Sequence, residues 1–305
     1  MHPPRISIVM PCRNQADFVE RAICSVLDQG YPNLEFLIID GGSTDGSLDI
    51  INQYRADLAG VVSEPDTGPA QAINKALARA TGQIVGILGA DDLYLPRTLR
   101  HVAQAMSAPD GPAWLVGQCL RIGDLDQMLG KLEPGDPGEL LTFLMHDSGP
   151  LPSVATFWSR NFFTQFGPFD EDLQFAYDYD YWCRLLAAGQ RPQILNQILA
   201  AKREHLASRS ALHTVEQGLE HIHAARQNAA LLPVAQRYAL WRNCDQRARI
   251  YALAQAELHG QEARQFIWQQ LVRHPWWLAN NSIRHAVLHG VRLRQPQLQL
   301  QRQAA

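Results

Sequence analysis

Two adjacent carboxylates, Asp91 and Asp92, follow a short apolar run at residues 84–88. Carboxylates are rarely left buried without a partner, and a pair at the end of a strand suits a divalent cation, which prefers hard oxygen ligands. The alternative is a polar loop in which one of the two caps the helix that begins near Pro96. The pair alone favours the loop, so the choice depends on the rest of the chain.

A third carboxylate stands at the end of another predicted strand. Asp40 closes the apolar run 34–40 and precedes a glycine-rich segment, 41–47, that leads into a helical pattern. Strands covered on both faces are typically continuous in apolar residues, as this run is. Open parallel sheets bind ligands beyond the carboxyl ends of their strands, where we expect both Asp40 and Asp91.

The first half of the chain alternates between strand and helix patterns. We expect strands at 6–11, 34–40, 61–64, 84–91 and 114–119, with helices between them, including 70–80 and 96–106. This alternation predicts an α/β fold with a doubly wound, mostly parallel sheet.

The second half is less regular. Residues 123–138 predict a loop or hairpin, 153–158 a strand and 194–200 a final strand. A helix between these strands has a core face of Trp182, Leu185 and Leu186 and ends at Gly189.

Composition limits the class of protein. The chain has 305 residues, 46% of them hydrophobic and 19% charged, as in an ordinary soluble globular protein. A net charge of -3 argues against a nucleic-acid binder. The five scattered cysteines suggest neither a disulfide framework nor a zinc site. There is no signal-peptide core and no apolar run of about 18 residues, so we expect a cytoplasmic protein without a transmembrane helix.

The character of the chain changes near residue 212. Glycine becomes rare, and alanine, leucine, glutamine, arginine and histidine dominate to the end. We therefore expect a first domain at 1–211 and a helical region at 212–305.

Several motifs occur in an order that points to one family. They are Ser7 to Asn14, Asp40 to Ser47, Ser63 to Asp66 with Ala72 to Leu77, Gly89 to Asp92, Ala155 to Trp158 and Tyr177 to Leu185. Over about residues 5–210 the chain resembles the family 2 glycosyltransferases, which have the GT-A fold. The segment at 89–92 takes the place of that family's DXD metal motif. The resemblance implies that 1–211 is the catalytic domain, with a nucleotide half at about 1–120 and an acceptor half at about 121–211.

The resemblance implies an inverting, metal-dependent hexosyltransferase that uses a nucleotide-sugar, with UDP favoured. The metal would be Mn²⁺ or Mg²⁺, which neutralises the charge on a departing diphosphate. Asp91 would be its carboxylate ligand and His205 would complete the site; a structural role for His205 is the alternative. The family often has an acidic residue where Gly89 stands, and Asp92 is expected to compensate. The nucleotide-binding residues would be Pro11, Arg13, Asn14, Asp40 (to the uracil N3–H), Asp66, Ala90 and Asp92.

Inverting transfer needs a general base for the acceptor hydroxyl. By resemblance this is Asp178, with Asp180 as its rival and helix capping as its structural alternative. If the segment is helical, the two carboxylates point to different sides and only one faces the sugar. Arg203, Ser208 and Arg209 are weaker candidates for contact with the diphosphate.

The C-terminal region allows two interpretations. Trp276 and Trp277 precede apolar positions such as Ile283 and Val291, with Arg284 and Arg292 interspersed. This mixture suits peripheral contact with an anionic membrane, on the inner face and near a lipid-linked acceptor. A helix packed on the catalytic domain or on a second subunit is the alternative.

Three functions compete. The first is a glycosyltransferase acting on a glycan or lipid-linked acceptor, in bacterial envelope polysaccharide synthesis by analogy with the family. The second, a nucleotidyltransferase, would need a glycine-rich phosphate loop after the first strand, and residues 13–17 contain no glycine. The third is a non-catalytic nucleotide- or sugar-binding module of the same fold.

Overall fold

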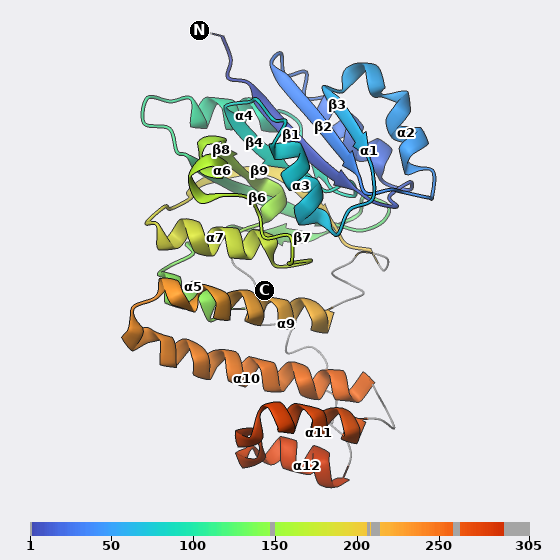
Figure 1. The fold of residues 1–305 in the computed structure, drawn as a ribbon. Helices are drawn as coiled ribbons and strands as arrows, with labels where there is room; N and C mark the ends of the chain where they lie inside the picture. Colours follow the sequence, from blue (N-terminus) through green and yellow to red (C-terminus); the bar gives the residue numbers. More distant parts are fainter. Residues whose placement is uncertain (1, 147–149, 206–207, 209–213, 259–262, 290–305) are drawn as a thin grey trace. The chain divides into compact units, whose positions relative to one another are not determined.

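The computed structural model describes residues 2–146, 150–205, 208, 214–258 and 263–289. The chain divides into two compact units. One comprises Met1–Phe143 and Gly149–Leu212, and the other comprises Leu144–Ser148 and His213–Ala305. The first is an α/β unit and the second is helical, as the sequence predicts (Figure 1).

The first unit is built on one sheet with the strand order β3-β2-β1-β4-β8-β6-β9-β5, and β7 pairs with β6 outside this path. The strands are β1 (Ile6–Cys12), β2 (Leu34–Asp40), β3 (Gly60–Ser63), β4 (Ile84–Ile87), β5 (Leu93–Tyr94), β6 (Trp114–Ile122), β7 (Met128–Leu132), β8 (Thr156–Ser159) and β9 (Gln193–Arg203).

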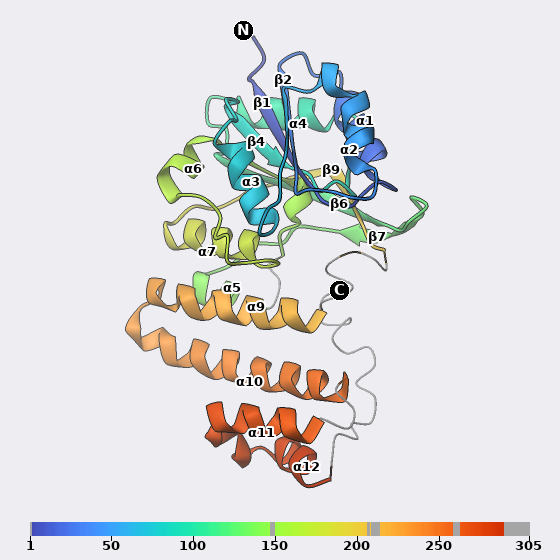
Figure 2. The ribbon, with the colours of Figure 1, turned by 45° about the vertical axis from the view of Figure 1, so that its right-hand side comes forward.

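Helices flank this sheet (Figures 1 and 2). Alternation along β1 explains the packing, because successive side chains point to opposite faces. Ile6, Ile8 and Met10 are buried in one cluster with apolar side chains of α1 and α4, whereas α3 contacts the same sheet at β1 and β2. The helices of the unit are α1 (Val19–Leu27), α2 (Ser47–Gln53), η1 (Arg55–Asp57), α3 (Pro69–Leu77), α4 (Thr98–Met106), α5 (Leu140–Leu144, whose last residue counts with the second unit), η2 (Ser153–Ala155), α6 (Asn161–Phe166) and α7 (Tyr177–Ala187).

Parallel pairing continues only as far as β4. The strands β3, β2, β1 and β4 are parallel, but β8 pairs antiparallel with both β4 and β6, and β6 is parallel to β9. The prediction of a mostly parallel sheet is therefore right for the first half and too simple for the second. Strand direction depends on the connections between strands, which local periodicity does not contain.

The second unit consists of helices. They are α9 (Thr214–Gln227), η3 (Asn228–Leu231), α10 (Val234–Leu258), α11 (Ala263–Arg273), η5 (Pro275–Ala279) and α12 (Asn281–His289). Trp277, Ile283 and Ala286 are buried, and their segments contact α10 and α11 of the same unit, so these positions pack within the helical unit itself, which neither interpretation of this segment expects. Val291 and Arg292 lie outside the described residues. None of the described helices is both long and apolar enough to cross a bilayer.

Candidate active site

The loops that carry the predicted site residues meet at one edge of the sheet. β2 lies between β1 and β3 in a register that places Cys12, Asp40 and Ser63 side by side at the strand ends. β4 runs parallel to β1 and delivers residues 88–92 to the same edge. Because ligands of such sheets bind beyond this edge, the topology alone assembles the nucleotide side of the predicted site.

Asp91 and His205 lie next to each other although 114 positions separate them in the chain. The distance from His205 Nε2 to Asp91 Oδ2 is 3.3 Å. The Asp91 side chain is 24% exposed and that of His205 only 5%. The Phe18 ring packs against the imidazole with centroids 4.6 Å apart. The imidazole is thus held in place beside a carboxylate that solvent can reach.

This pair fits a divalent cation. Two adjacent ligands of an octahedral ion, each at about 2.1 Å, lie roughly 3 Å apart, close to the observed separation. Within the described part of the chain, no group of three or more His, Cys, Asp or Glu side chains gathers around a point. From this pair the protein would supply one oxygen and one nitrogen, and water and phosphate oxygens would take other positions, as in many Mg²⁺ sites. Metal binding by Asp91 and His205 stays a prediction.

Asp92 and Ala90 take more internal positions. The backbone N–H of Arg203 donates to Asp92 Oδ1 at 2.9 Å. Loss of solvent, followed by the nearby charge of Asp91, raises the pKa of Asp92 above its usual range, and a cation bound between the two would act in the opposite direction. Ala90 is 2% exposed, so only its backbone could meet a nucleotide. The nucleotide contacts of both residues stay predictions.

Arg203 braces the acidic loop from inside the protein. Its side chain has no exposed surface, and its Nη2 lies 2.5 Å from Asp126 Oδ1. The Nε donates to the Asp91 carbonyl at 2.8 Å, and Nη1 donates to the Gly123 carbonyl at 2.7 Å. Its guanidinium also lies 4.9 Å from the centroid of the Phe18 ring. A buried charge needs partners of this kind, and here they fix the backbone of a predicted metal ligand.

This role of Arg203 differs from its expected contact with a diphosphate, which its burial does not allow. Ser208 is 9% exposed, and Arg209 lies outside the described residues. Sequence reasoning missed the brace because its partners come from segments about 80 and 112 residues away. The only local signal is an arginine at the end of a strand, next to Glu204 and His205.

Asp40 is buried, and its carboxylate is used within the protein. It accepts hydrogen bonds from the Ser63 hydroxyl at 2.6 Å and from the Ser43 backbone N–H at 3.1 Å, together with the Ser43 hydroxyl. None of its surface is exposed. Asp40 therefore holds the loop between β2 and α2 in shape. Its predicted contact with a uracil base stays a prediction and would require this loop to open.

Pro11 and Asn14 lie beside that loop, at the end of β1. Pro11 is half-buried and stands opposite Ile39 of β2. Asn14 has a left-handed backbone, with φ 52°, a conformation that asparagine tolerates. Its Oδ1 accepts the Thr44 N–H at 2.9 Å, and its own N–H donates to Ser43 Oγ at 2.8 Å. The Asn14 side chain thus joins the first two loops of the edge.

Asp66 and Arg13 supply the charged groups of this part of the edge. Burial raises the pKa of Asp66, and the positive charge of Arg13 opposes that shift. Arg13 itself is exposed. The Asp66 carboxylate lies directly over Gly41, where a Cβ would collide with it. Glycine at position 41 therefore leaves the space that Asp66 occupies, and the nucleotide contacts of both charged residues stay predictions.

The two candidate bases, Asp178 and Asp180, both lie in α7. As expected for a helix, their side chains have different surroundings. Asp180 is 7% exposed, and its Oδ2 accepts the Arg184 Nε–H at 3.0 Å. Arg184 also donates to the carbonyls of Phe166 and Pro168. Asp178 is only half-buried, and its Oδ1 accepts the Tyr179 N–H at 2.7 Å in the first turn. Asp180 is thus committed to an internal ion pair, which leaves Asp178 as the better candidate for the base.

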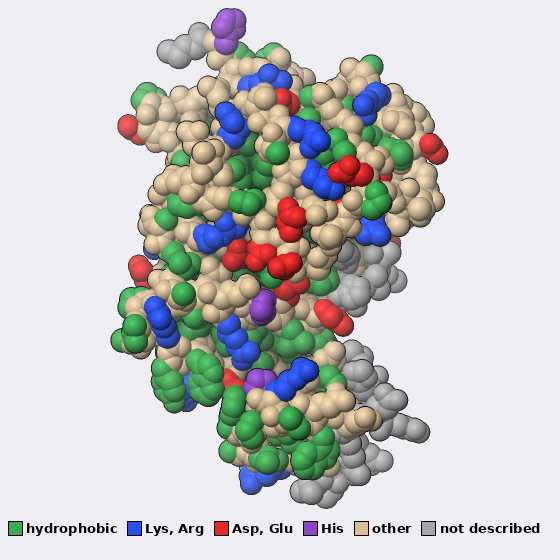
Figure 3. Space-filling model, viewed as in Figure 1, with side chains coloured by type: hydrophobic (Ala, Val, Ile, Leu, Met, Phe, Trp, Pro, Cys, Tyr) green, Lys and Arg blue, Asp and Glu red, His purple; other side chains and the backbone are tan. Residues whose placement is uncertain are grey.

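A set of side-chain bonds connects α3 to the loop that precedes α7. The Asn74 amide donates to the Phe169 carbonyl and accepts the Phe169 N–H, at 2.9 and 3.0 Å. Gln174 Nε2 donates to the Thr67 carbonyl at 2.9 Å. At Gly68, φ is 152°, and a Cβ would collide with the Gln174 amide, so this turn requires glycine. Figure 3 shows that acidic side chains gather on the surface between α3 and α7.

A comparison with protein families decides the class. The family model described as "Glycosyl transferase family 2" matches residues 7–126. This range includes the strand ends, Asp40, Asp66 and the Asp91–Asp92 pair. Residues 7–126 form a family 2 glycosyltransferase domain.

Two bacterial proteins illustrate the likeness to curated sequences. The chain is 42% identical over 94 residues to the putative teichuronic acid biosynthesis glycosyltransferase TuaG of Bacillus subtilis, a match that covers 30% of this chain and 37% of that protein. It is 27% identical over 232 residues to an uncharacterized glycosyltransferase of Rickettsia typhi, covering 71% of this chain and 70% of the relative. Of the length of TuaG, the chain spans only a little more than a third.

Solved structures share the fold. TarS of S. aureus, crystallised as residues 1–349 with UDP-GlcNAc, matches with a TM-score of 0.64 and 18% identity over 86% of this chain and 78% of that one. A mannosyltransferase from Pyrobaculum calidifontis, in complex with GDP-Man and Mn²⁺, matches with a TM-score of 0.56 and 21% identity over 93% of this chain and 83% of that one. The predicted GT-A fold is confirmed.

Proposed function

We propose that this glycosyltransferase moves a sugar from a UDP-sugar to a hydroxyl of a glycan or lipid-linked acceptor, with inversion, in the synthesis of a bacterial cell-envelope polysaccharide. The observation that carries the proposal is the Asp91–His205 pair, 3.3 Å apart at the carboxyl edge of the sheet. The envelope pathway is supported by the likeness to TuaG, and UDP by the ligand of TarS.

On the donor side, Asp91 and His205 would hold Mn²⁺ or Mg²⁺, which supplies charge stabilisation to a departing diphosphate. The likeness to a mannosyltransferase solved with Mn²⁺ supports a divalent ion. Arg203 keeps the Asp91 backbone in place through its bond to the carbonyl. Preorganisation of this kind matters because a group that must move during the reaction stabilises the transition state less.

On the acceptor side, Asp178 would take the proton of the attacking hydroxyl. That oxygen forms a bond to the anomeric carbon while the bond from this carbon to the diphosphate oxygen breaks, and UDP departs on the opposite face. The proton ends on the Asp178 carboxylate. This carboxylate lies in the N-terminal turn of α7, where the helix dipole stabilises negative charge.

The experiment that tests the function measures nucleotide release from a panel of UDP-, GDP- and dTDP-sugars with Mn²⁺. We expect UDP release from one UDP-sugar, rising when an acceptor is added, with NMR showing the inverted anomer in the product. The second candidate is a non-catalytic nucleotide- or sugar-binding module of the same fold. Binding of a nucleotide-sugar without turnover would establish that candidate and contradict ours.

Peripheral membrane contact is also part of the proposal. Tyr238, Trp241 and Trp276 are 67%, 43% and 46% exposed, and their rings follow one another at centroid distances of 6.0 and 5.8 Å. Exposed aromatic side chains favour the interface of a bilayer. We expect the full chain to co-sediment with anionic liposomes, and the double variant Trp241→Ser, Trp276→Ser to remain mostly in the supernatant. Trp268→Ser, also at an exposed position, is the control, and equal partitioning of all three proteins would exclude this surface.

A further inference from the structure

The second unit contains a cavity of about 250 Å³ between α9, α10, α11 and η5. All of its lining residues belong to this unit, so it is a feature of the helical region itself. Apolar side chains form much of its wall, including Ile222, Ala252 and Trp277, which are 2%, 3% and 2% exposed. This volume lies slightly below the roughly 300 Å³ at which ordinary small-molecule sites start, so a ligand of this cavity would be small, about one sugar unit.

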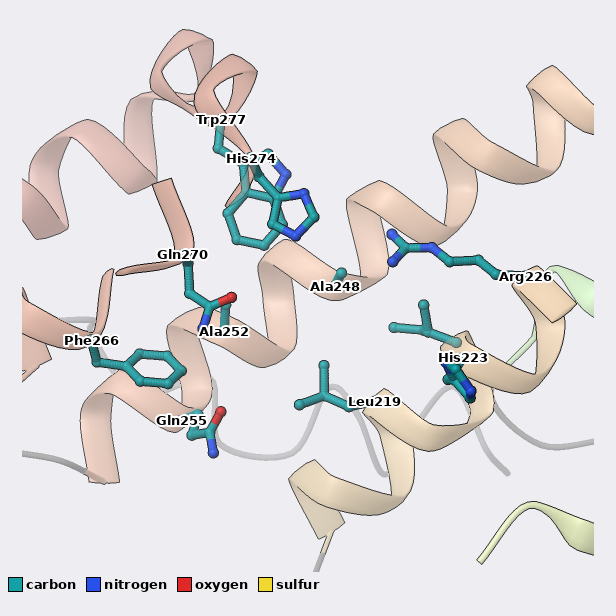
Figure 4. A pocket seen from close by; sticks show the side chains of 11 residues that line it. Leu219, His223, Arg226, Ala248, Ala252, Gln255, Phe266, Gln270, His274 and Trp277 are labelled. Carbon is teal, nitrogen blue, oxygen red and sulfur yellow. The ribbon is translucent and has the colours of Figure 1, made fainter. Parts of the chain in front are cut away.

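Polar groups converge on this apolar wall from both ends (Figure 4). Gln255 and Gln270 lie at one end with Phe266, and His223 and Arg226 lie at the other. Among the described residues, no hydrogen bond or ion pair engages the side chains of Arg226, Gln255 or Gln270. Apolar pockets with a few unpaired polar groups are typical binding sites, since those groups fix the orientation of a ligand.

His274 adds a third polar group. Its ring stacks on Trp277 with centroids 4.6 Å apart, and its Nδ1 is buried without a hydrogen-bond partner in the described part of the chain. Buried polar atoms normally have a partner, so an orphaned one calls for an explanation. A ligand in the cavity would provide that partner.

The charge of the cavity selects the class of ligand. Its lining includes Arg226 and two histidines but no acidic side chain. Burial and then the charge of Arg226 lower the pKa of His274, so Arg226 is the permanent charge at neutral pH. An arginine presents a planar set of donors that matches carboxylate and phosphate groups. The two glutamines, which both donate and accept, match hydroxyl groups.

We propose that this cavity binds one negatively charged sugar unit, with its carboxylate or phosphate on Arg226 and its hydroxyls on Gln255 and Gln270. The choice of a sugar rests on the proposed function, because such a unit would belong to the acceptor glycan. The site lies outside the family 2 domain and involves none of the residues assigned to the donor or to the base.

Calorimetric titration of the full chain tests this, with UDP and Mn²⁺ present so that the donor site is filled. The probes are methyl β-glucuronide, glucose 6-phosphate, the neutral methyl β-glucoside and inorganic phosphate. We expect one or both charged sugars to bind at least about tenfold more tightly than the neutral sugar, since hydrogen bonds to charged groups are the stronger ones. Comparison of methyl β-glucuronide with glucose 6-phosphate shows whether the site prefers a uronate or a sugar phosphate.

Three variants assign the binding to the cavity. Arg226→Gln should remove the preference for charge, and Gln270→Leu should weaken both charged and neutral sugars. Arg242→Gln changes an exposed arginine of α10 that does not line the cavity and should bind like the wild type. The proposal is overturned if the charged sugars fail to bind at millimolar concentration, if inorganic phosphate binds as tightly, or if Arg226→Gln has no effect.

The outcome is independent of the donor site. Asp91→Asn should abolish the calorimetric response to UDP with Mn²⁺ and leave binding of the charged sugar intact. If no nucleotide-sugar turns over but the sugar still binds in an Arg226-dependent way, the proposed transferase reaction fails and the cavity assignment stands.

Discussion

Asp178→Asn is expected to lower the transfer rate by about 10²–10⁴-fold, the contribution that a positioned general base makes. The amide has nearly the same shape as the carboxylate but cannot take the acceptor proton. Because the variant leaves the donor side unchanged, the affinity for UDP with Mn²⁺ should stay close to that of the wild type. Steady-state kinetics of UDP release, together with nucleotide titration, would measure both quantities.

Asp180→Asn provides the contrast. This carboxylate is buried in an ion pair with Arg184, and removing one partner of a buried pair costs about 3–5 kcal/mol of stability. We expect a lower melting temperature with a kcat that falls much less. Asp172→Asn, at an exposed position before α7, should change neither. Full activity in Asp178→Asn with a 10²-fold loss in a folded Asp180→Asn would reverse the assignment of the base.

Asp91→Asn is expected to abolish Mn²⁺-dependent nucleotide binding and to reduce turnover by about 10²–10³-fold, as the loss of a preorganised electrostatic contact does. The neutral amide is a poorer ligand for a hard cation than a carboxylate. In thermal unfolding, the wild type should be stabilised by UDP only when Mn²⁺ is present, since a ligand that binds only the native state raises the free energy of unfolding with the logarithm of its concentration relative to its Kd.

His205→Ala should weaken the same Mn²⁺-dependent shift, because the imidazole is the second ligand offered to the ion. The matched control is Asp124→Asn, an exposed aspartate of the same region that contributes only a backbone carbonyl to Arg203. A shift with UDP and Mn²⁺ that survives in Asp91→Asn would show that the ion is bound elsewhere.

The elements that place the site could be predicted because their signals are local. The apolar runs that end at Asp40 and near Asp91 mark two strand ends, and their parallel pairing brings those ends to one edge. The amphipathic pattern around Trp182 correctly predicts α7. Asp178 and Asp180 are two positions apart in that helix, so their side chains point to different sides of it.

The features that could not be predicted depend on contacts between distant segments. The brace formed by Arg203 joins residues about 80 to 112 positions apart, and no periodic pattern encodes such a contact. The same applies to Asp40, whose burial depends on Ser63 from another strand, and to the antiparallel insertion of β8 between β4 and β6.

The bond from Gln174 to the Thr67 carbonyl has a consequence for the order of substrate binding. Thr67 follows Asp66, whose Oδ1 accepts the Gly68 N–H at 3.1 Å, and Gln174 precedes Asp178 by four residues. A nucleotide that contacts Asp66 would therefore stabilise the turn at residues 66–68, to which Gln174 donates its hydrogen bond. An acceptor would then meet a base whose segment is stabilised by the bound donor as well as by the protein, which would favour a kinetic scheme with the nucleotide-sugar first.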